Sequence, residues 1–156
     1  MSDDLWSFAL SLYAKPGIEE LCLQAQSQGA DVCLLICAAW LQKQQHPYCR
    51  QQHQKLLSSA NNWQQHVIEP LRTLRIQWRS HVQQEPALGP LREQLKVLEL
   101  SAEQALLKQL EICCKQWPRI DQGEECNWLE QLYPEAILSA DAQQKLRIAL
   151  QSTLLS

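Results

Sequence analysis

Five charged residues offer the most suggestive chemistry in the sequence, because they fall on two segments that we expect to pack together. The residues are Arg72, Arg75, Arg79, Glu99 and Glu103. At about 100° of rotation per residue, the arginines cluster on one flank of the apolar stripe of a helix expected at 62–84. The glutamates are four residues apart and lie on a flank of a helix expected at 91–116. A short loop between these helices favours antiparallel packing, so the two flanks are expected to meet.

Such a meeting of arginine and glutamate has two interpretations. Ion pairs between helices are common at the seam of a bundle, and this structural role is the more frequent one. Alternatively, the guanidinium groups of Arg72 and Arg75 bind a carboxylate or phosphate of a ligand or partner, because the arginine fork matches such anions in a bidentate geometry. The spacing of the residues is compatible with both interpretations.

Metal binding is not indicated by the remaining candidate ligands. Bundles that hold two metal ions use a Glu-x-x-His motif, whereas here His66 precedes Glu69. One short segment offers three candidate zinc ligands, His46, Cys49 and His53, but a closed structural site needs a fourth and usually a more regular spacing. We therefore expect no metal and no cofactor, and the role of this segment stays open.

The cysteines indicate a reducing compartment. There are seven of them, an odd number, and no Cys-x-x-Cys motif occurs. Cys33 and Cys37 lie within an apolar run, where cysteine behaves as a small hydrophobic residue. The chain begins MSDDLW, which is acidic and unlike a signal peptide. We therefore expect free thiols in a cytoplasmic protein.

An uncharged stretch, Val32 to Leu41, is expected to organise the fold. A continuous apolar run can be a buried strand or a buried helix, and periodicity alone does not separate them. Asp31 is a good N-cap and the residues after Leu41 are helix formers, so the flanks favour a helix at about 31–45. Ten residues are too few to cross a bilayer. This segment therefore predicts a helix surrounded by its neighbours.

The rest of the chain predicts an all-α, single-domain helical bundle over residues 1–156. Glycine is scarce while glutamine, leucine and alanine are abundant, as is typical of helical proteins. Further helices are expected at 3–14, 18–28, 62–84, 91–116 and 140–154, with weaker helical segments near 56–57 and 127–133. Residues 118–126 are expected to form a polar loop.

Two long apolar stripes are expected to face the core. One comprises Trp63, Val67, Leu71, Leu74, Trp78 and Val82. The other comprises Leu91, Leu95, Leu98, Ala102, Ala105 or Leu106, and Cys113. Pro70 interrupts the first, so a kink or break is expected near 65–69.

Three segments resemble an uncharacterised proteobacterial family of small helical proteins, of about 160 residues, that has a domain-of-unknown-function label. The first runs from Leu5-Trp6 through Cys22-Leu23 and Gln26 to Gly29 and Asp31-Val32. The second contains Trp63, Pro70-Leu71-Arg72 and Arg75, and the third Glu99-Leu100 and Ala102-Glu103. The resemblance covers roughly 5–110, and the part from about 118 is more divergent. It implies a bacterial, mostly helical, intracellular protein and no particular activity.

These observations favour a binding protein over an enzyme. No Ser-His-Asp order, phosphate loop or dinucleotide motif is present. A net charge of −3 lacks the basic excess of a general nucleic-acid binder. We expect a cytoplasmic, non-enzymatic regulator or adaptor that binds another macromolecule, most simply a protein, and no membrane. The alternative is an enzyme or a small-anion-binding protein with an Arg/Glu pocket between the helices at 62–84 and 91–116. The oligomeric state is left open.

Overall fold

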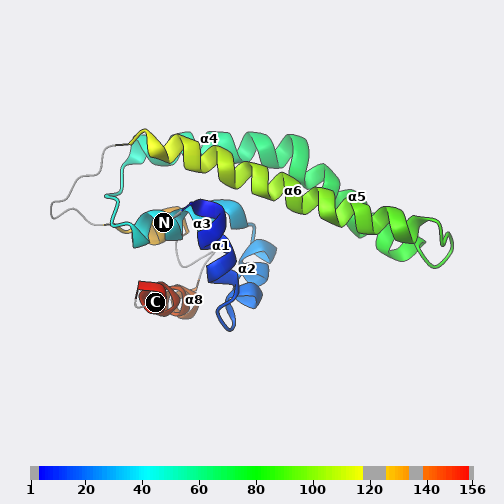
Figure 1. The fold of residues 1–156 in the computed structure, drawn as a ribbon, viewed down its shortest axis with the longest axis horizontal. Coiled ribbons are helices and arrows are strands. Elements are labelled where there is room, and N and C mark those ends of the chain that lie inside the picture. The colour runs from blue at the N-terminus through cyan, green and yellow to red at the C-terminus, as the bar shows by residue number, and fades with distance from the viewer. Residues whose placement is uncertain (1–3, 118–125, 134–138, 155–156) are drawn as a thin grey trace.

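The computed structural model describes residues 4–117, 126–133 and 139–154, and every regular element within them is helical (Figure 1). The elements are α1 (Leu5–Tyr13), α2 (Ile18–Ser27), α3 (Val32–Lys43), α4 (Arg50–Trp63), η1 (Gln64–Ile68), α5 (Glu69–His81), α6 (Leu88–Lys115), α7 (Trp128–Leu132) and α8 (Ala140–Leu154). The all-α prediction is confirmed. The loop expected at 118–126 lies, except for Cys126, outside the described residues.

Helix α3 is the centre of the globular body, as predicted. All nine residues from Cys33 to Leu41 are at most 6 % exposed. The Asp31 side chain caps the helix by accepting a hydrogen bond from the Leu34 N–H at 3.3 Å. Helices α1, α2, α4, α6, α7 and α8 all contact α3. Because it is covered on all sides, its sequence needs no polar face.

Helices α4 and α5 are joined through η1 into one long helical run. This corrects one expectation, because the helix begins at Arg50 rather than near 62. No glycine or proline interrupts residues 50–69, so the glutamine-rich stretch continues as helix.

The irregularity expected near 65–69 is a π-helical turn. In η1 the Glu69 N–H donates to the carbonyl of Gln64, five residues back. Pro70, directly after it, has no N–H, and its ring would meet the carbonyl of the preceding turn. The wider π turn accommodates the proline without ending the helix.

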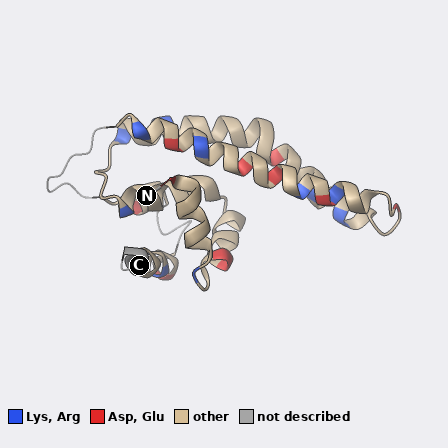
Figure 2. Ribbon diagram, in the orientation of Figure 1, with Lys and Arg blue, Asp and Glu red and all other residues tan. Residues whose placement is uncertain are grey.

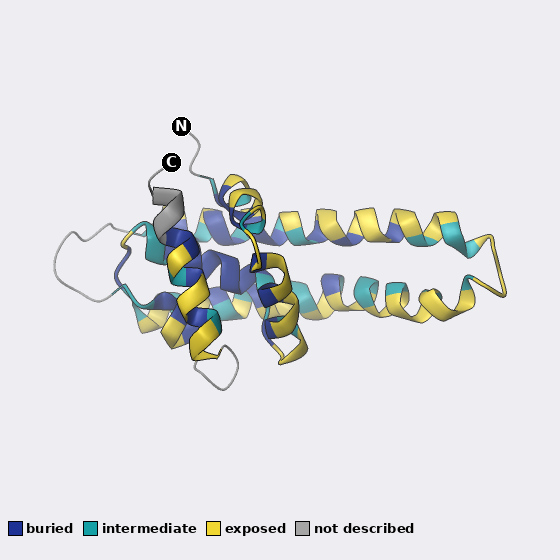
Figure 3. Cartoon of the chain, turned by 90° about the horizontal axis from the view of Figure 1, so that it is seen from below, coloured by how far each residue is buried: buried dark blue, intermediate teal, exposed yellow. Residues whose placement is uncertain are grey.

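Helix α5 and the first half of α6 form a two-helix arm that extends beyond the body (Figures 1 and 3). The two helices are antiparallel, as expected from their short connection. Helix α6 begins at Leu88 rather than 91, because Pro90 falls in its first turn, where proline is tolerated. No residue of α5 is fully buried.

The arm corrects the prediction that both long stripes lie in the core. Leu95 and Ala102 are buried, but Leu91 and Leu98 are 48 % and 54 % exposed. Leu74 on α5 is 39 % exposed, and Trp78 is half-buried rather than part of the core. The body does not reach this far along the arm, so part of each stripe has no covering layer.

The C-terminal helices complete the body. Ser139 caps α8, its hydroxyl accepting a hydrogen bond from the Ala142 N–H at 3.2 Å. Trp128 is fully buried and stacks on Trp117 with ring planes 7° apart, so Trp128 is part of the core. Among the described residues, no helix is both long and apolar enough to span a membrane.

Candidate functional site

The arginine and glutamate flanks meet where the arm joins the body, and Glu99 is the centre of the contact. Arg72 Nε lies 3.2 Å from Glu99 Oε2, and Arg75 Nε lies 2.5 Å from Oε1 of the same carboxylate. Arg75 Nη2 donates to Glu99 Oε2 as well, at 3.3 Å. Glu99 is only 6 % exposed. Two guanidinium groups therefore neutralise one buried carboxylate.

The other predicted members of the site take lesser parts. Glu103 lies 3.9 Å from Arg72 Nη2, a distance at which the ion pair is loose. Arg79 is exposed and forms no ion pair with a described carboxylate. The structure thus brings together four of the five predicted residues and leaves Arg79 nearer the tip of the arm.

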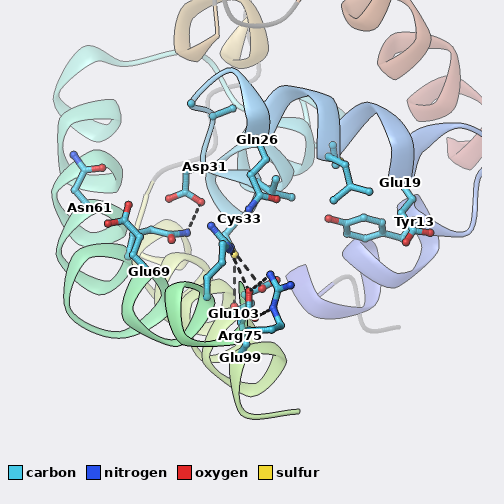
Figure 4. A pocket seen from close by; sticks show the side chains of 17 residues that line it. Tyr13, Glu19, Gln26, Asp31, Cys33, Asn61, Glu69, Arg75, Glu99 and Glu103 are labelled. Atoms are coloured by element: carbon cyan, nitrogen blue, oxygen red, sulfur yellow. Dashed lines mark hydrogen bonds and ion pairs between the residues drawn. The ribbon is translucent and has the colours of Figure 1, made fainter. Parts of the chain in front are cut away.

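A glutamine of the body also accepts hydrogen bonds from Arg72. With its amide oxygen toward the guanidinium, as complementarity of donor and acceptor requires, Gln26 of α2 accepts from Arg72 Nη1 at 2.8 Å. Arg72 therefore connects the body, through Gln26, to the arm, through Glu99. Figure 4 shows Gln26, Arg75, Glu99 and Glu103 gathered between the helices.

The cap of α3 is tied to the same region. Gln64, in the π turn, donates from Nε2 to Asp31 Oδ1 at 2.9 Å. Next to it, the Trp63 indole N–H donates to the Ala102 carbonyl of α6 at 2.9 Å. These bonds fix the π turn against both the central helix and the long helix, which sets the direction in which the arm leaves the body.

We call the contact among Arg72, Arg75, Glu99 and Glu103 the Arg/Glu seam. A hollow of about 400 Å³ lies beside it. Its charged lining residues are Glu19, Asp31, Glu69, Arg72, Arg75, Glu99 and Glu103. Carboxylates outnumber guanidinium groups, and both guanidinium groups are already bound to Glu99. The hollow therefore has little capacity left to attract an anion.

Burial modifies the acids that line the hollow. It raises the pKa of Asp31, against the opposing effect of hydrogen bonds from Leu34 and Gln64. It also raises the pKa of Glu103, and the neighbouring Glu99 charge adds to this increase. Both carboxyl groups are thus easier to protonate than they would be in water.

The thiols near the hollow are not activated as nucleophiles. Burial raises the pKa of Cys22 to about 11 and that of Cys33 well above its ordinary value. A nucleophilic cysteine needs a lowered pKa, so these side chains are inert at neutral pH. Cys37 and Cys114 face each other at 3.9 Å in the core as reduced thiols.

The segment with three candidate zinc ligands is organised by aromatic packing instead. His46 stands against the Trp117 ring at 5.4 Å, and its Nε2 lies 3.2 Å from the side-chain oxygen of Gln52. His53 Nδ1 lies 2.5 Å from the Tyr48 hydroxyl, within hydrogen-bond distance. Within the described part of the chain, no three His, Cys, Asp or Glu side chains are arranged to hold a metal ion.

A family of proteins of unknown function, DUF2390, matches residues 4–110. The chain belongs to this family. No curated protein and no solved structure matches the chain significantly. The range matched by DUF2390 contains Asp31, both sides of the Arg/Glu seam and the whole arm, and it ends within α6.

The contacts of two glutamines in this site could not be predicted from the sequence. Gln26 belongs to a segment that resembles the family, but the resemblance implies no contact for it, and nothing in the spacing of Gln64 distinguishes it from the many other glutamines. Asp31 was identified as a helix cap, but its bond to Gln64 depends on a contact between segments 33 residues apart. Only the tertiary structure places these three polar side chains around one hollow.

Proposed function

We propose that this protein is a non-enzymatic regulator or adaptor that binds another helical protein through its arm. The observation on which this proposal rests is a row of apolar side chains on α5 and α6 that are exposed or only half-buried. We define the arm face as Leu71, Leu74, Trp78, Leu91 and Leu98. Exposed apolar patches of this kind mark interaction sites in soluble proteins.

The spacing of residues on α6 is typical of a helix with two partners. Apolar residues alternate at intervals of three and four, as in a coiled coil: Leu88, Leu91, Leu95, Leu98, Ala102 and Ala105. Leu95 and Ala102 are buried, whereas Leu91 and Leu98 are about half exposed. One half of the apolar seam is thus covered, and the other half is available to a further helix.

The arm face and the charged side of the arm are separate surfaces. On α6, Leu95 faces α5. Leu98 lies about 60° from Leu95 in one direction around the helix, and Arg92 and Lys96 lie about 60–100° away in the opposite direction. On α5, Leu74 and Arg72 likewise lie on opposite sides of Leu71, in the same two directions of rotation. Because the helices are antiparallel, equal senses of rotation lead to the same side of the pair. Figure 2 shows where charged residues lie along the arm.

The Arg/Glu seam supports this proposal because it holds the arm in place. Its guanidinium groups are bound within the chain by Glu99 and Gln26, so they hold the arm at a fixed angle to the body. A rigid arm presents its arm face without the entropy cost of ordering a flexible segment on binding.

We assign the protein to a bacterial cytoplasm. The six cysteines other than Cys126 are reduced thiols, as a reducing compartment would keep them. The bacterial source is what the resemblance of its three segments to a proteobacterial family implies. The absence of an activated thiol at the hollow favours binding over covalent catalysis.

The test compares two neighbouring substitutions on α6. Leu98→Glu places a charge in the arm face, whereas Val97→Glu places one on a side chain that is 65 % exposed and about 100° away around the helix. Tagged wild-type and variant chains are used to capture proteins from the native host, and each captured protein is then purified and tested for direct binding. We expect a helical protein that binds wild type and Val97→Glu but not Leu98→Glu. If no directly bound protein is lost selectively with Leu98→Glu, the proposal is wrong.

The hollow favours a second candidate function, the binding of a small ligand. Its volume of about 400 Å³ is that of a ligand pocket. The excess of carboxylates leads us to expect an amine rather than the anion considered from the sequence. Thermal melts with a simple diamine and with inorganic phosphate separate these possibilities. Stabilisation by the diamine alone supports the amine, stabilisation by phosphate alone supports the anion, and no stabilisation by either rejects this candidate.

A further inference from the structure

We propose that the partner of the arm face is a second copy of this chain, so that two arms pair into an antiparallel four-helix bundle. This inference rests on the proposed function, because it names the occupant of the same surface. Each arm would contribute α5 and α6, and a two-fold axis would relate the copies, as in most homodimers. Leu91 and Leu98 of each copy would then complete the half-covered seam of the other.

The border of the arm face indicates a homotypic partner. Charged residues beside an apolar seam set partner choice in helical bundles, because they attract one partner and repel others. Here the residues that border the face are Gln77 on α5, and Gln94 and Ser101 on α6. His81, at the outer end of α5, is on the same side, with Nδ1 close to the carbonyl of Gln77. Because Gln77, Gln94 and Ser101 carry no charge, they select no charged partner and do not repel a second copy of the chain.

The charges of the arm lie where they do not obstruct such pairing. Arg72 and Arg75 are bound to Glu99 on the opposite side, and Lys96 pairs with Glu93 at 3.2 Å. Arg92 reaches across the arm and donates from Nε to the carbonyl of Arg75 at 2.9 Å. An arm whose charges are mostly used internally can approach an identical arm without the repulsion that a net charge would cause.

The size of the face predicts the strength of the association. A face about 20 Å long and two helices, about 20 Å, wide buries about 400 Å² per copy. The total of about 800 Å² is below that of standard stable interfaces. We therefore expect a reversible dimer that forms as the protein concentration rises, rather than an obligate one.

Sedimentation velocity of the full chain over a wide range of concentration tests the inference, with the same two variants. Wild type and Val97→Glu are expected to shift from monomer to dimer as concentration rises, and Leu98→Glu is expected to stay monomeric. Circular dichroism shows whether each variant keeps its helical content. A second variant at the face, Leu91→Gln, is expected to weaken the dimer at least tenfold, a change that does not depend on introducing a charge.

The outcomes separate this inference from the proposed function. A wild-type chain that is monomeric at every concentration overturns the inference, as does a dimer that Leu98→Glu and Leu91→Gln leave intact. If the wild type is monomeric but a different protein binds in a manner that needs Leu98, the arm still binds a partner and only its identity as a second copy is wrong. If the dimer forms and only Leu98→Glu and Leu91→Gln weaken it, the second copy is the partner.

Discussion

Apolar residues occur in both the body and the arm, but they are buried in the body and partly exposed in the arm. In the body, α3 is covered by six other helices and has no exposed residue from Cys33 to Leu41. In the arm, α5 has an apolar stripe and no fully buried residue. In Figure 3 the dark, buried residues gather mainly in the body, whereas the arm is mostly yellow and teal. The comparison indicates that apolar residues stabilise the fold in one region and are available for binding in the other.

The largest expected effect comes from truncating one leucine in each region of the same helix. Leu106 of α6 is fully buried in the body, and its replacement by alanine should lower the free energy of unfolding by about 2–5 kcal/mol. Leu98, two turns earlier in the arm, is half exposed, so Leu98→Ala should cost less than about 0.5 kcal/mol. Urea unfolding at low protein concentration measures both. Equal losses would show that the arm is as tightly covered as the body.

The next effect concerns the seam between the two regions. Glu99→Ala should lower the free energy of unfolding by about 1–3 kcal/mol, because it leaves two partly buried guanidinium groups without their carboxylate. Arg72→Ala should cost about 1–2 kcal/mol, since Arg75 still neutralises Glu99. Thermal melts measure both changes. An Arg72→Ala variant that melts like wild type but no longer binds its ligand or partner would contradict the structural role of the seam.

A smaller effect is expected at Asp31, and it depends on pH. The pKa of Asp31 is raised in the folded state, so the folded protein binds this proton more tightly than the unfolded chain does. This group therefore makes the free energy of unfolding fall as pH rises from about 4, its unfolded pKa, towards the raised value. Asn keeps the N-cap acceptor but does not titrate.

The measurement for Asp31 is urea unfolding of wild type and Asp31→Asn at a series of pH values. The stability of Asp31→Asn relative to wild type should increase as pH rises above about 4 and level off above the raised pKa of Asp31. A difference that is constant with pH, or that changes in the opposite direction, would contradict the raised pKa.

The smallest expected effect is at Arg79, which serves as the control for the seam. It has the same residue type and the same flank as Arg72 but is exposed and forms no ion pair with a described carboxylate. Arg79→Ala should change the free energy of unfolding by less than about 0.5 kcal/mol. A loss comparable to that of Arg72→Ala would mean that the seam extends further along the arm than the contacts indicate.

Much of the fold could be predicted from local patterns. The cap at Asp31, the apolar helix after it and the irregularity before Pro70 follow from residue chemistry within a few positions. The meeting of Arg72, Arg75 and Glu99 could be predicted because two long helices joined by a short loop pack antiparallel. The start of α4 at Arg50 could not, since the glutamine-rich residues there have neither a strong apolar period nor a stop signal.

The sequence by itself determined which residues share a face of each helix, since this depends only on the repeat of 3.6 residues per turn. It therefore determined the charged and apolar sides of α5 and α6. Only the tertiary structure decided that Leu98 is exposed while Leu106, on the same helix, is buried. The reason is physical: whether an apolar face is covered depends on where neighbouring elements end in space, and the body ends before it reaches the arm.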